Sequence, residues 1–179
     1  VVSAPCYPFG VIDPVADVAP RAAALGIACH VDACIGGWVL PFWGEGLPRW
    51  DFRVPGVTSM SLDAHKYGYS PKGVSVLLFA DRDAKRAASF ATTDWPGYPV
   101  VNPTMLGSRS ATALAAAWAI LEYLGADGLT GLTARTRQAT ETLAGVVAGI
   151  EGLRVAGAPS GPLFAVRTDP EAAAGRGVD

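Results

Sequence analysis

Residues 57–80 read VTSMSLDAHKYGYSPKGVSVLLFA, and this stretch decides the fold class. Its first eight residues start with β-branched side chains and then alternate, which is typical of a strand. A turn rich in proline and glycine follows at 67–73, and the apolar run at 74–80 is the clearest strand of the chain. His65 and Lys66 stand between the first strand and the turn. Lys66 is therefore either a solvated charge on a turn or an amine held where chemistry takes place.

Two further strand patterns precede this stretch. The apolar run at 27–31 ends at Asp32 and is typical of a short buried strand, and Val1–Val2 look like the end of another. The apolar segment 33–43 is interrupted by two glycines and a proline, so we expect it to be irregular or a short helix.

A helix is expected between these strands, over residues 14–25. Asp13 would supply a capping carboxylate, and Pro14 fits the first helical position because its φ is already fixed. Gly26 would end the helix. Pro20 lies inside the stretch, so we expect a kink or a shorter helix there.

The second half of the chain changes from strands to longer helices. Residues 81–109 hold a small charged helix and then a loop, and helical spacing covers 110–124 and 130–150. The apolar side chains of the first long helix are expected in the core: Leu114, Trp118, Leu121 and Leu124.

Strand patterns return at 153–157 and 162–168. Strands that alternate with helices predict an α/β fold with a mostly parallel sheet. We expect three parts, with residues 1–109 as the sheet domain, 110–150 as linking helices and 151–179 as the start of a second layer.

The composition narrows the possible functions. The net charge is −2, only 17% of the 179 residues are charged, and no basic stripe is visible, which argues against nucleic-acid binding. No apolar run reaches the ~18 residues that a membrane helix needs. Three cysteines, an odd number, do not suggest a disulfide framework and favour a reducing, cytoplasmic setting.

Ionisable groups follow two of the predicted strands, Asp32 after the first and His65–Lys66 after the second. Ligands of open α/β sheets bind at the carboxyl ends of the strands. A lysine amine and a carboxylate at neighbouring strand ends suit pyridoxal 5'-phosphate, whose aldehyde bonds to the amine and whose ring nitrogen pairs with the acid. From spacing alone, Asp32 could equally be a turn or capping residue and Lys66 a surface charge.

Three motifs strengthen the chemical interpretation. They are HVDACIGGW at 30–38, DFRVPGVTSMSLDAHKYGYSPKG at 51–73 and GSR at 107–109. In content and order they resemble the pyridoxal-phosphate-dependent decarboxylase superfamily of aspartate-aminotransferase fold, and within it most of all the sphingosine-1-phosphate lyase branch. The resemblance runs from about Ser3 to Thr168. It implies fold type I, with residues 1–109 as part of the large, cofactor-binding domain and 151–179 as the start of the small C-terminal domain.

The resemblance also implies roles for particular residues. Lys66 would be the lysine that bonds to the cofactor, and Asp32 the partner of the pyridine nitrogen. His65 would contact the cofactor phosphate or shape its pocket, and Lys72 would be a second active-site cation suited to a substrate phosphate. Ser3 would lie near the cofactor ring. Lys72 read alone could be an ordinary turn lysine.

The motif at 107–109 is implied to work across a homodimer interface. Gly107 and Ser108 would lie close to the active site of the other subunit. Arg109 is either a surface charge at a helix start or an interface clamp.

The sequence departs from the family pattern at a few positions near the expected substrate. In DWPGYPVV, residues 94–101, Tyr98 stands in place of a glycine and Val100 in place of a tyrosine, and Phe9 replaces a common histidine. These changes leave the substrate open, either a phosphorylated amino alcohol or an amino acid. The family's phosphate-binding loop would come before Val1, so we expect the chain to be a fragment of a longer protein.

Three functions remain in view: a lyase that cleaves a carbon–carbon bond, an amino-acid decarboxylase on the same cofactor, and a truncated module without catalysis. A metal site at Cys29, His30 and Cys34 is disfavoured, because consecutive strand residues such as Cys29 and His30 point to opposite faces. His30 is then either a packed residue or a neighbour of the cofactor.

Overall fold

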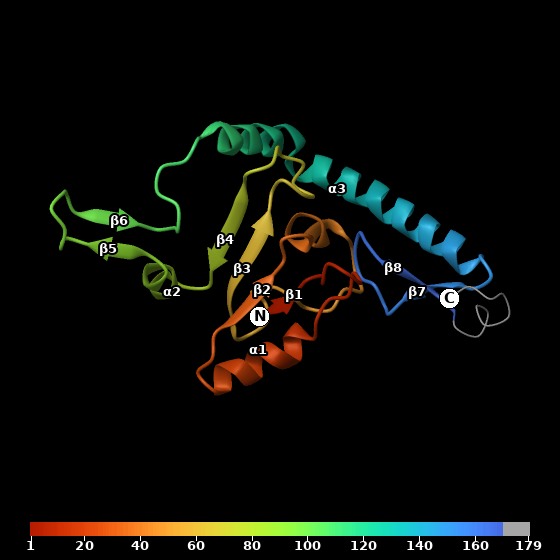
Figure 1. Ribbon diagram of the computed structural model, residues 1–179. Helices are drawn as coiled ribbons and strands as arrows, with labels where there is room; N and C mark the ends of the chain where they lie inside the picture. The colour runs from red at the N-terminus through yellow and green to blue at the C-terminus, as the bar shows by residue number, and fades with distance from the viewer. Residues whose placement is uncertain (170–179) are drawn as a thin grey trace.

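The computed structural model describes residues 1–169, and its centre is a four-stranded sheet (Figure 1). The strands stand in the order β1-β2-β3-β4. Their bounds are Val2–Ser3 for β1, Cys29–Asp32 for β2, Val57–Asp63 for β3 and Ser75–Phe79 for β4. The first three run parallel, and β4 runs antiparallel to β3. The prediction of an α/β fold with a mostly parallel sheet is confirmed.

Helix α1 (Val15–Ala24) connects β1 to β2 and packs on the sheet through Val15 and Ala19, which are fully buried. Pro14 is its N-cap and no side chain caps it, so the expected cap by Asp13 is wrong. The Asp13 carboxylate instead accepts a hydrogen bond of 2.8 Å from the backbone N–H of Ser3. The helix continues through Pro20, because the one backbone hydrogen bond that proline removes is offset by burial of the face beside it.

Two short 3-10 turns, Gly36–Trp38 and Leu40–Phe42, follow β2, as the broken apolar pattern predicts. Gly36 is required by close packing rather than by a turn. A Cβ placed on it would lie 2.1 Å from the carbonyl oxygen of Ala4, a backbone atom that has no freedom to rotate away. The turn is thereby held against the end of β1.

Replacement of Gly36 by alanine should therefore destabilise the sheet. Relief of the overlap requires backbone movement, and we expect a loss of about 1–3 kcal/mol in the free energy of unfolding. Gly131→Ala is the matched control, because Gly131 is helical and a Cβ there meets nothing within 4 Å. That variant should be as stable as the wild type or up to about 1 kcal/mol more stable. Equal urea midpoints for the two variants would contradict the packing argument.

Beyond β4 the chain forms the charged helix α2 (Arg82–Ala87), which Asp81 caps by accepting from the N–H of Ala84 at 2.7 Å. Strands β5 (Phe90–Thr92) and β6 (Val100–Asn102) then form a hairpin that extends away from the central sheet (Figure 1). A loop was expected over this range. The hairpin could not be predicted, because each strand has only three residues, too few to show the alternation of apolar and polar side chains that marks a strand.

Helix α3 (Thr112–Ala148) is broken at Gly125, where φ is 56° and ψ is −170°. Two helical halves are thus present, as the spacing predicts. The expected burial of the first half is wrong in part, since Leu114 is 63% and Trp118 66% exposed. No element among residues 1–169 covers these two side chains, whereas the second half packs on the turn at 40–42 and on β7.

The chain then forms a second antiparallel hairpin, β7 (Leu153–Ala156) and β8 (Ala165–Thr168), at the end of α3 (Figure 1). Its connecting loop is tied to the N-terminal segment by a hydrogen bond of 2.7 Å from Ser160 N–H to the Gly10 carbonyl. Residues 170–179, the rest of the expected C-terminal part, lie outside the described residues. No helix within residues 1–169 is both long and apolar enough to cross a membrane.

Candidate active site

The parallel register brings three polar residues into one row across the carboxyl ends of the strands. Ser3 of β1 lies beside Asp32 of β2, and Asp32 lies beside Ser61 of β3. Residues side by side in a sheet share a face, so their side chains stand on the same side. Ser3 and Asp32, which the resemblance implies lie at the cofactor, are therefore neighbours in space.

Asp32 is held as an anion by its surroundings. Its Oδ1 accepts from the backbone N–H of Cys34 at 3.1 Å and from the Ser61 hydroxyl at 3.2 Å. Partial burial would raise the pKa of the carboxyl. The hydrogen bonds from the Cys34 amide and thiol and from Ser61, with the nearby His30 ring, outweigh burial and lower that pKa.

Lys66 follows β3 and turns its amine back toward the strand ends. Its Nζ lies 2.8 Å from Oδ2 of Asp63 and donates to the sulfur of Cys34 at 3.0 Å. Burial alone would lower the pKa of the ammonium group. The hydrogen bonds to Asp63 and Cys34 dominate, so the pKa of Lys66 is raised.

Cys34 connects the two groups singled out from the sequence. Its thiol is hydrogen-bonded to the Asp32 carboxylate on one side and to the Lys66 amine on the other. Burial raises the pKa of this thiol, so the residue is a neutral donor to Asp32. The acid and the amine thus meet at one small side chain rather than facing different regions of the molecule.

The remaining motif residues after β3 have other neighbours. His65 Nδ1 is 2.9 Å from the Val74 carbonyl, and its Nε2 is 3.6 Å from Asp63. A ring nitrogen that faces a carbonyl must carry the proton, which fixes Nδ1 as the donor. His65 thereby braces the turn that carries Lys66. Lys72 is exposed on the turn before β4.

The structure does not bring the segment 107–109 to the Asp32–Lys66 cluster within this chain. Gly107 and Ser108 are exposed in the loop after β6. The Arg109 guanidinium donates to the hydroxyl of Thr104 in the same loop. A role for these residues would require another subunit, as the resemblance implies.

Three residues of the cluster were missed by sequence reasoning. Asp63 holds the amine, Cys34 joins the amine to the acid, and Ser61 supports Asp32. The sequence contains an indication of two of them. Asp63 precedes Lys66 by three residues, and Ser61 lies two residues before Asp63, so both side chains stand on the same face of the strand. Cys34 entered the sequence analysis only as part of a disfavoured metal site, because its apolar neighbours indicate no contact with Asp32 or Lys66.

His30 is half-buried and hydrogen-bonded within the sheet. Its two ring nitrogens lie 2.8 Å from the Ser59 hydroxyl and 3.2 Å from the Ser61 hydroxyl. Through Ser61 the ring is linked to Asp32. Within the described part of the chain, no group of three or more histidine, cysteine or acidic side chains could hold a metal ion.

The Asp63–Lys66 pair should make stability depend on pH at both ends of the scale. The pKa of Asp63 is lowered: burial opposes this, but the bonds from Lys66 and Ser75 prevail. Asp63 therefore contributes to the free energy of unfolding above the unfolded carboxyl pKa of about 3.9, and this contribution is lost as the pH falls below that value. Lys66 contributes below the unfolded amine pKa of about 10.4, and its contribution is lost as the pH rises above that value. We expect Lys66→Met to cost roughly 1 kcal/mol at pH 7, after allowance for solvent screening.

The pH dependence of that cost is the measurement. Urea unfolding of the wild type and Lys66→Met should give a difference that shrinks toward pH 3 and again toward pH 11. A difference that stays constant over this range would mean that packing, and not the ion pair, is lost.

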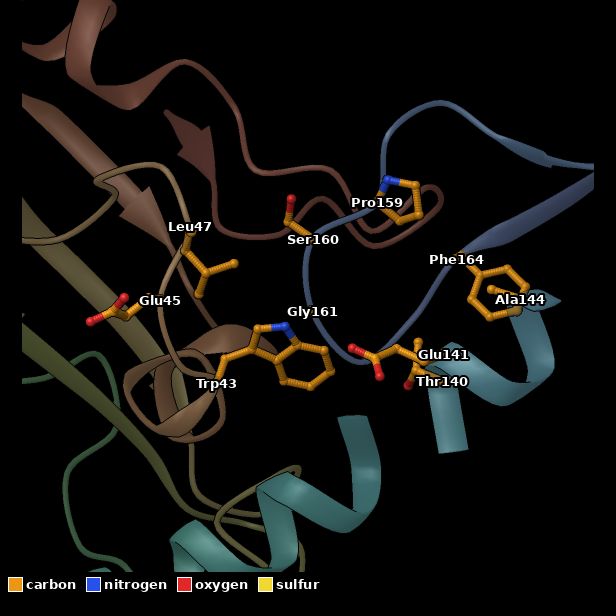
Figure 2. Close-up of a pocket in the computed structure, with 11 residues that line it drawn as sticks. Trp43, Glu45, Leu47, Thr140, Glu141, Ala144, Pro159, Ser160, Gly161 and Phe164 are labelled. Carbon is orange, nitrogen blue, oxygen red and sulfur yellow. The ribbon is translucent and has the colours of Figure 1, made fainter. Parts of the chain in front are cut away.

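A separate cavity of about 270 Å³ lies between the loop 43–47, the second half of α3 and the loop 159–164 (Figure 2). Trp43 and Phe164 form apolar walls, and Glu45 and Glu141 lie at its edge. Neither Asp32, Cys34 nor Lys66 lines it. The cavity is therefore distinct from the cluster at the strand ends.

The cluster fits pyridoxal phosphate in two respects. An anionic carboxylate, Asp32, is available to pair with a protonated ring nitrogen. A partly exposed amine, Lys66, lies one side chain away and is open to solvent on 35% of its side-chain surface, so a ligand has access to it. A lysine amine and a carboxylate are two of the groups with which proteins hold this cofactor.

The fold defines the class: the chain has the fold of pyridoxal-phosphate-dependent enzymes of fold type I, and an acid and a lysine lie at its strand ends. Comparison with known proteins gives the branch. The chain is homologous to sphingosine-1-phosphate lyases, as the motifs predict. It is 41% identical to the enzyme of Dictyostelium discoideum over 170 residues and 41% identical to that of Arabidopsis thaliana over 168 residues. These alignments cover 93% and 92% of the chain.

Solved structures agree. The sphingosine-1-phosphate lyase of Burkholderia pseudomallei superposes with a TM-score of 0.89 at 41% identity, over 94% of this chain and 39% of that one. A glutamate decarboxylase of Lactobacillus brevis superposes with a TM-score of 0.71 at 24% identity, over 86% of this chain and 36% of the enzyme, which shows the fold alone. No protein-family model matches the chain. The chain spans 32% of the length of the Dictyostelium relative and 31% of the Arabidopsis one.

Proposed function

We propose that this chain carries the lysine-bearing half of a pyridoxal-phosphate-dependent lyase site that cleaves a phosphorylated long-chain amino alcohol. The observation that supports this most is the contact of Cys34 with both Lys66 and Asp32. Homology to sphingosine-1-phosphate lyases along 93% of the chain supports the choice of substrate class. The products would be an aldehyde and phosphoethanolamine.

The chain's own groups would divide the work. Asp32, kept anionic by Cys34 and Ser61, would orient the cofactor ring and keep its nitrogen protonated. Lys66 would anchor the cofactor, and the Asp63 carboxylate, 2.8 Å from its Nζ, would hold the amine in place. When bound, pyridoxal phosphate would supply an electron sink for the carbon–carbon bond that breaks.

The bond to be broken lies between the carbon that bears the amine and the carbon that bears the hydroxyl. The hydroxyl loses its proton and becomes a carbonyl, and the bonding electron pair moves to the amine-bearing carbon, which then takes up a proton. Lys72, a cation on the exposed turn before β4, is proposed to hold the substrate phosphate.

Spectral titration of the intact protein with pyridoxal phosphate tests the proposal. Wild-type protein should develop the absorbance band of a lysine-bound cofactor, and pyridoxamine phosphate, which lacks the aldehyde, should not produce it. The loaded protein should release an aldehyde from a phosphorylated sphingoid base. Carbon dioxide released from an amino acid instead would favour the decarboxylase reading, and no band at all would favour a module without catalysis.

We also propose that the protein is a homodimer. Support comes from large apolar side chains left exposed on one part of the chain: Leu77, Phe90, Met105, Trp118 and Tyr123. Three of them, Leu77, Phe90 and Met105, line one open cavity, and apolar side chains gathered on a surface are typical of an interaction site. Trp118→Glu should lower the mass measured by sedimentation from dimer to monomer. Leu143→Glu, at an exposed position beyond the break in α3, is the control and should leave the mass unchanged.

A cytoplasmic location is proposed as well. All three cysteines are free thiols, which suits a reducing compartment. Fractionation of cells that express the tagged protein tests this, and recovery in the membrane fraction would contradict it.

A further inference from the structure

Asp63 is fixed from three directions at the end of β3. Its Oδ1 accepts from the hydroxyl of Ser75, its partner residue on β4, and its backbone N–H donates to the Cys34 carbonyl at 3.2 Å. The ring of His65 lies 3.6 Å from Oδ2. With a side chain only 15% exposed, Asp63 has little freedom to move away from the Lys66 amine.

The site therefore holds two carboxylates with different partners. Asp63 forms a direct ion pair of 2.8 Å with Lys66, whereas Asp32 reaches the amine only through the thiol of Cys34. Asp32 stays available for another positive group. A single carboxylate could not neutralise both the lysine and a protonated ring.

We propose that Asp63 is the positioning residue of Lys66: its ion pair directs the amine toward Cys34 and holds it as a cation until a cofactor binds. Loss of the Asp63 charge should therefore make the Lys66 ammonium easier to deprotonate. The inference deepens the proposed function and rests on it.

The charged and titratable groups around Lys66 are few. Asp63 and His65 face it from its own strand and turn, with His65 acting through Asp63. Cys34 faces it from the segment after β2, with Asp32 behind the thiol. Removal of the Asp63 charge is thus the change that alters the amine most directly.

Pulse labelling with acetic anhydride over a pH series, read for each lysine by peptide mass spectrometry, measures this without any cofactor. In the intact protein, Asp63→Asn should move the pH midpoint of Lys66 labelling downward and speed its labelling at pH 8 about three- to fivefold, as expected for loss of a partly exposed ion pair. Asp63→Glu should keep a midpoint near that of the wild type. Ser75→Ala, which frees one carboxylate oxygen, should give a smaller downward shift.

Lys72 serves as the reference within each sample, and its midpoint should be the same in all variants. An unchanged Lys66 midpoint in Asp63→Asn, with Lys72 also unchanged, would overturn the inference. A purely structural role would slow or speed both lysines together and would overturn it too. Failure of the proposed function is seen separately, as lack of cofactor binding by the wild type.

Discussion

Lys66→Ala is expected to abolish the absorbance band that pyridoxal phosphate gives with the wild-type protein, and all turnover with it. The amine at this position is the nucleophile that the proposed function requires, and alanine has nothing to replace it. The measurement is the absorbance spectrum of the loaded protein after removal of free cofactor. The expected loss is complete, because the band arises from the bond between lysine and cofactor.

Two further variants separate chemistry from folding. Lys66→Arg keeps a cation beside Asp63 but does not form that bond, so it should fold as the wild type does and still lack the band. Lys72→Ala removes the neighbouring lysine of the turn and should keep the band. A band retained by Lys66→Ala would show that another amine binds the cofactor and that the assignment of Lys66 is wrong.

Asp32→Asn is expected to slow turnover by roughly 100-fold or more while the protein remains folded. The asparagine oxygen can still accept from the Cys34 amide and the Ser61 hydroxyl, but the negative charge that would keep the cofactor nitrogen protonated is lost. Removal of one preorganised electrostatic partner typically costs about 10²–10³ in kcat. Steady-state rates with saturating cofactor provide the comparison.

The matched control is Asp51→Asn, which removes a carboxylate that pairs with Arg53 away from the strand ends. Its turnover should stay within about twofold of the wild type. Equal rates for Asp32→Asn and the wild type would remove Asp32 from the mechanism.

The sheet could be predicted because its strands leave period and composition signals. The runs at 27–31, 57–64 and 74–80 lie on β2, β3 and β4. The hairpin β5–β6 could not be predicted, because strands of three residues pair with each other and bury no periodic face. Trp118 was misplaced because helical spacing identifies an apolar face but not what covers it.

The site was predicted only in outline. Asp32 and Lys66 could be paired from sequence because each follows a strand and the motifs around them resemble a known family. The contact between them depends on Cys34, whose backbone is held by Asp32 on one side and Asp63 on the other. The contact is set by which residues of β2 pair with which residues of β3. That pairing cannot be read from the sequence of either strand alone.

The central claim is that Lys66, held between Asp63 and Cys34, is the amine that binds pyridoxal phosphate. Borohydride reduction of the loaded protein, followed by peptide mass spectrometry, tests it most directly, since reduction makes the lysine–cofactor bond permanent. The account predicts a stoichiometric phosphopyridoxyl group on Lys66 and none on Lys72 or Lys85. A modification spread over surface lysines, or located on any residue other than Lys66, would contradict it.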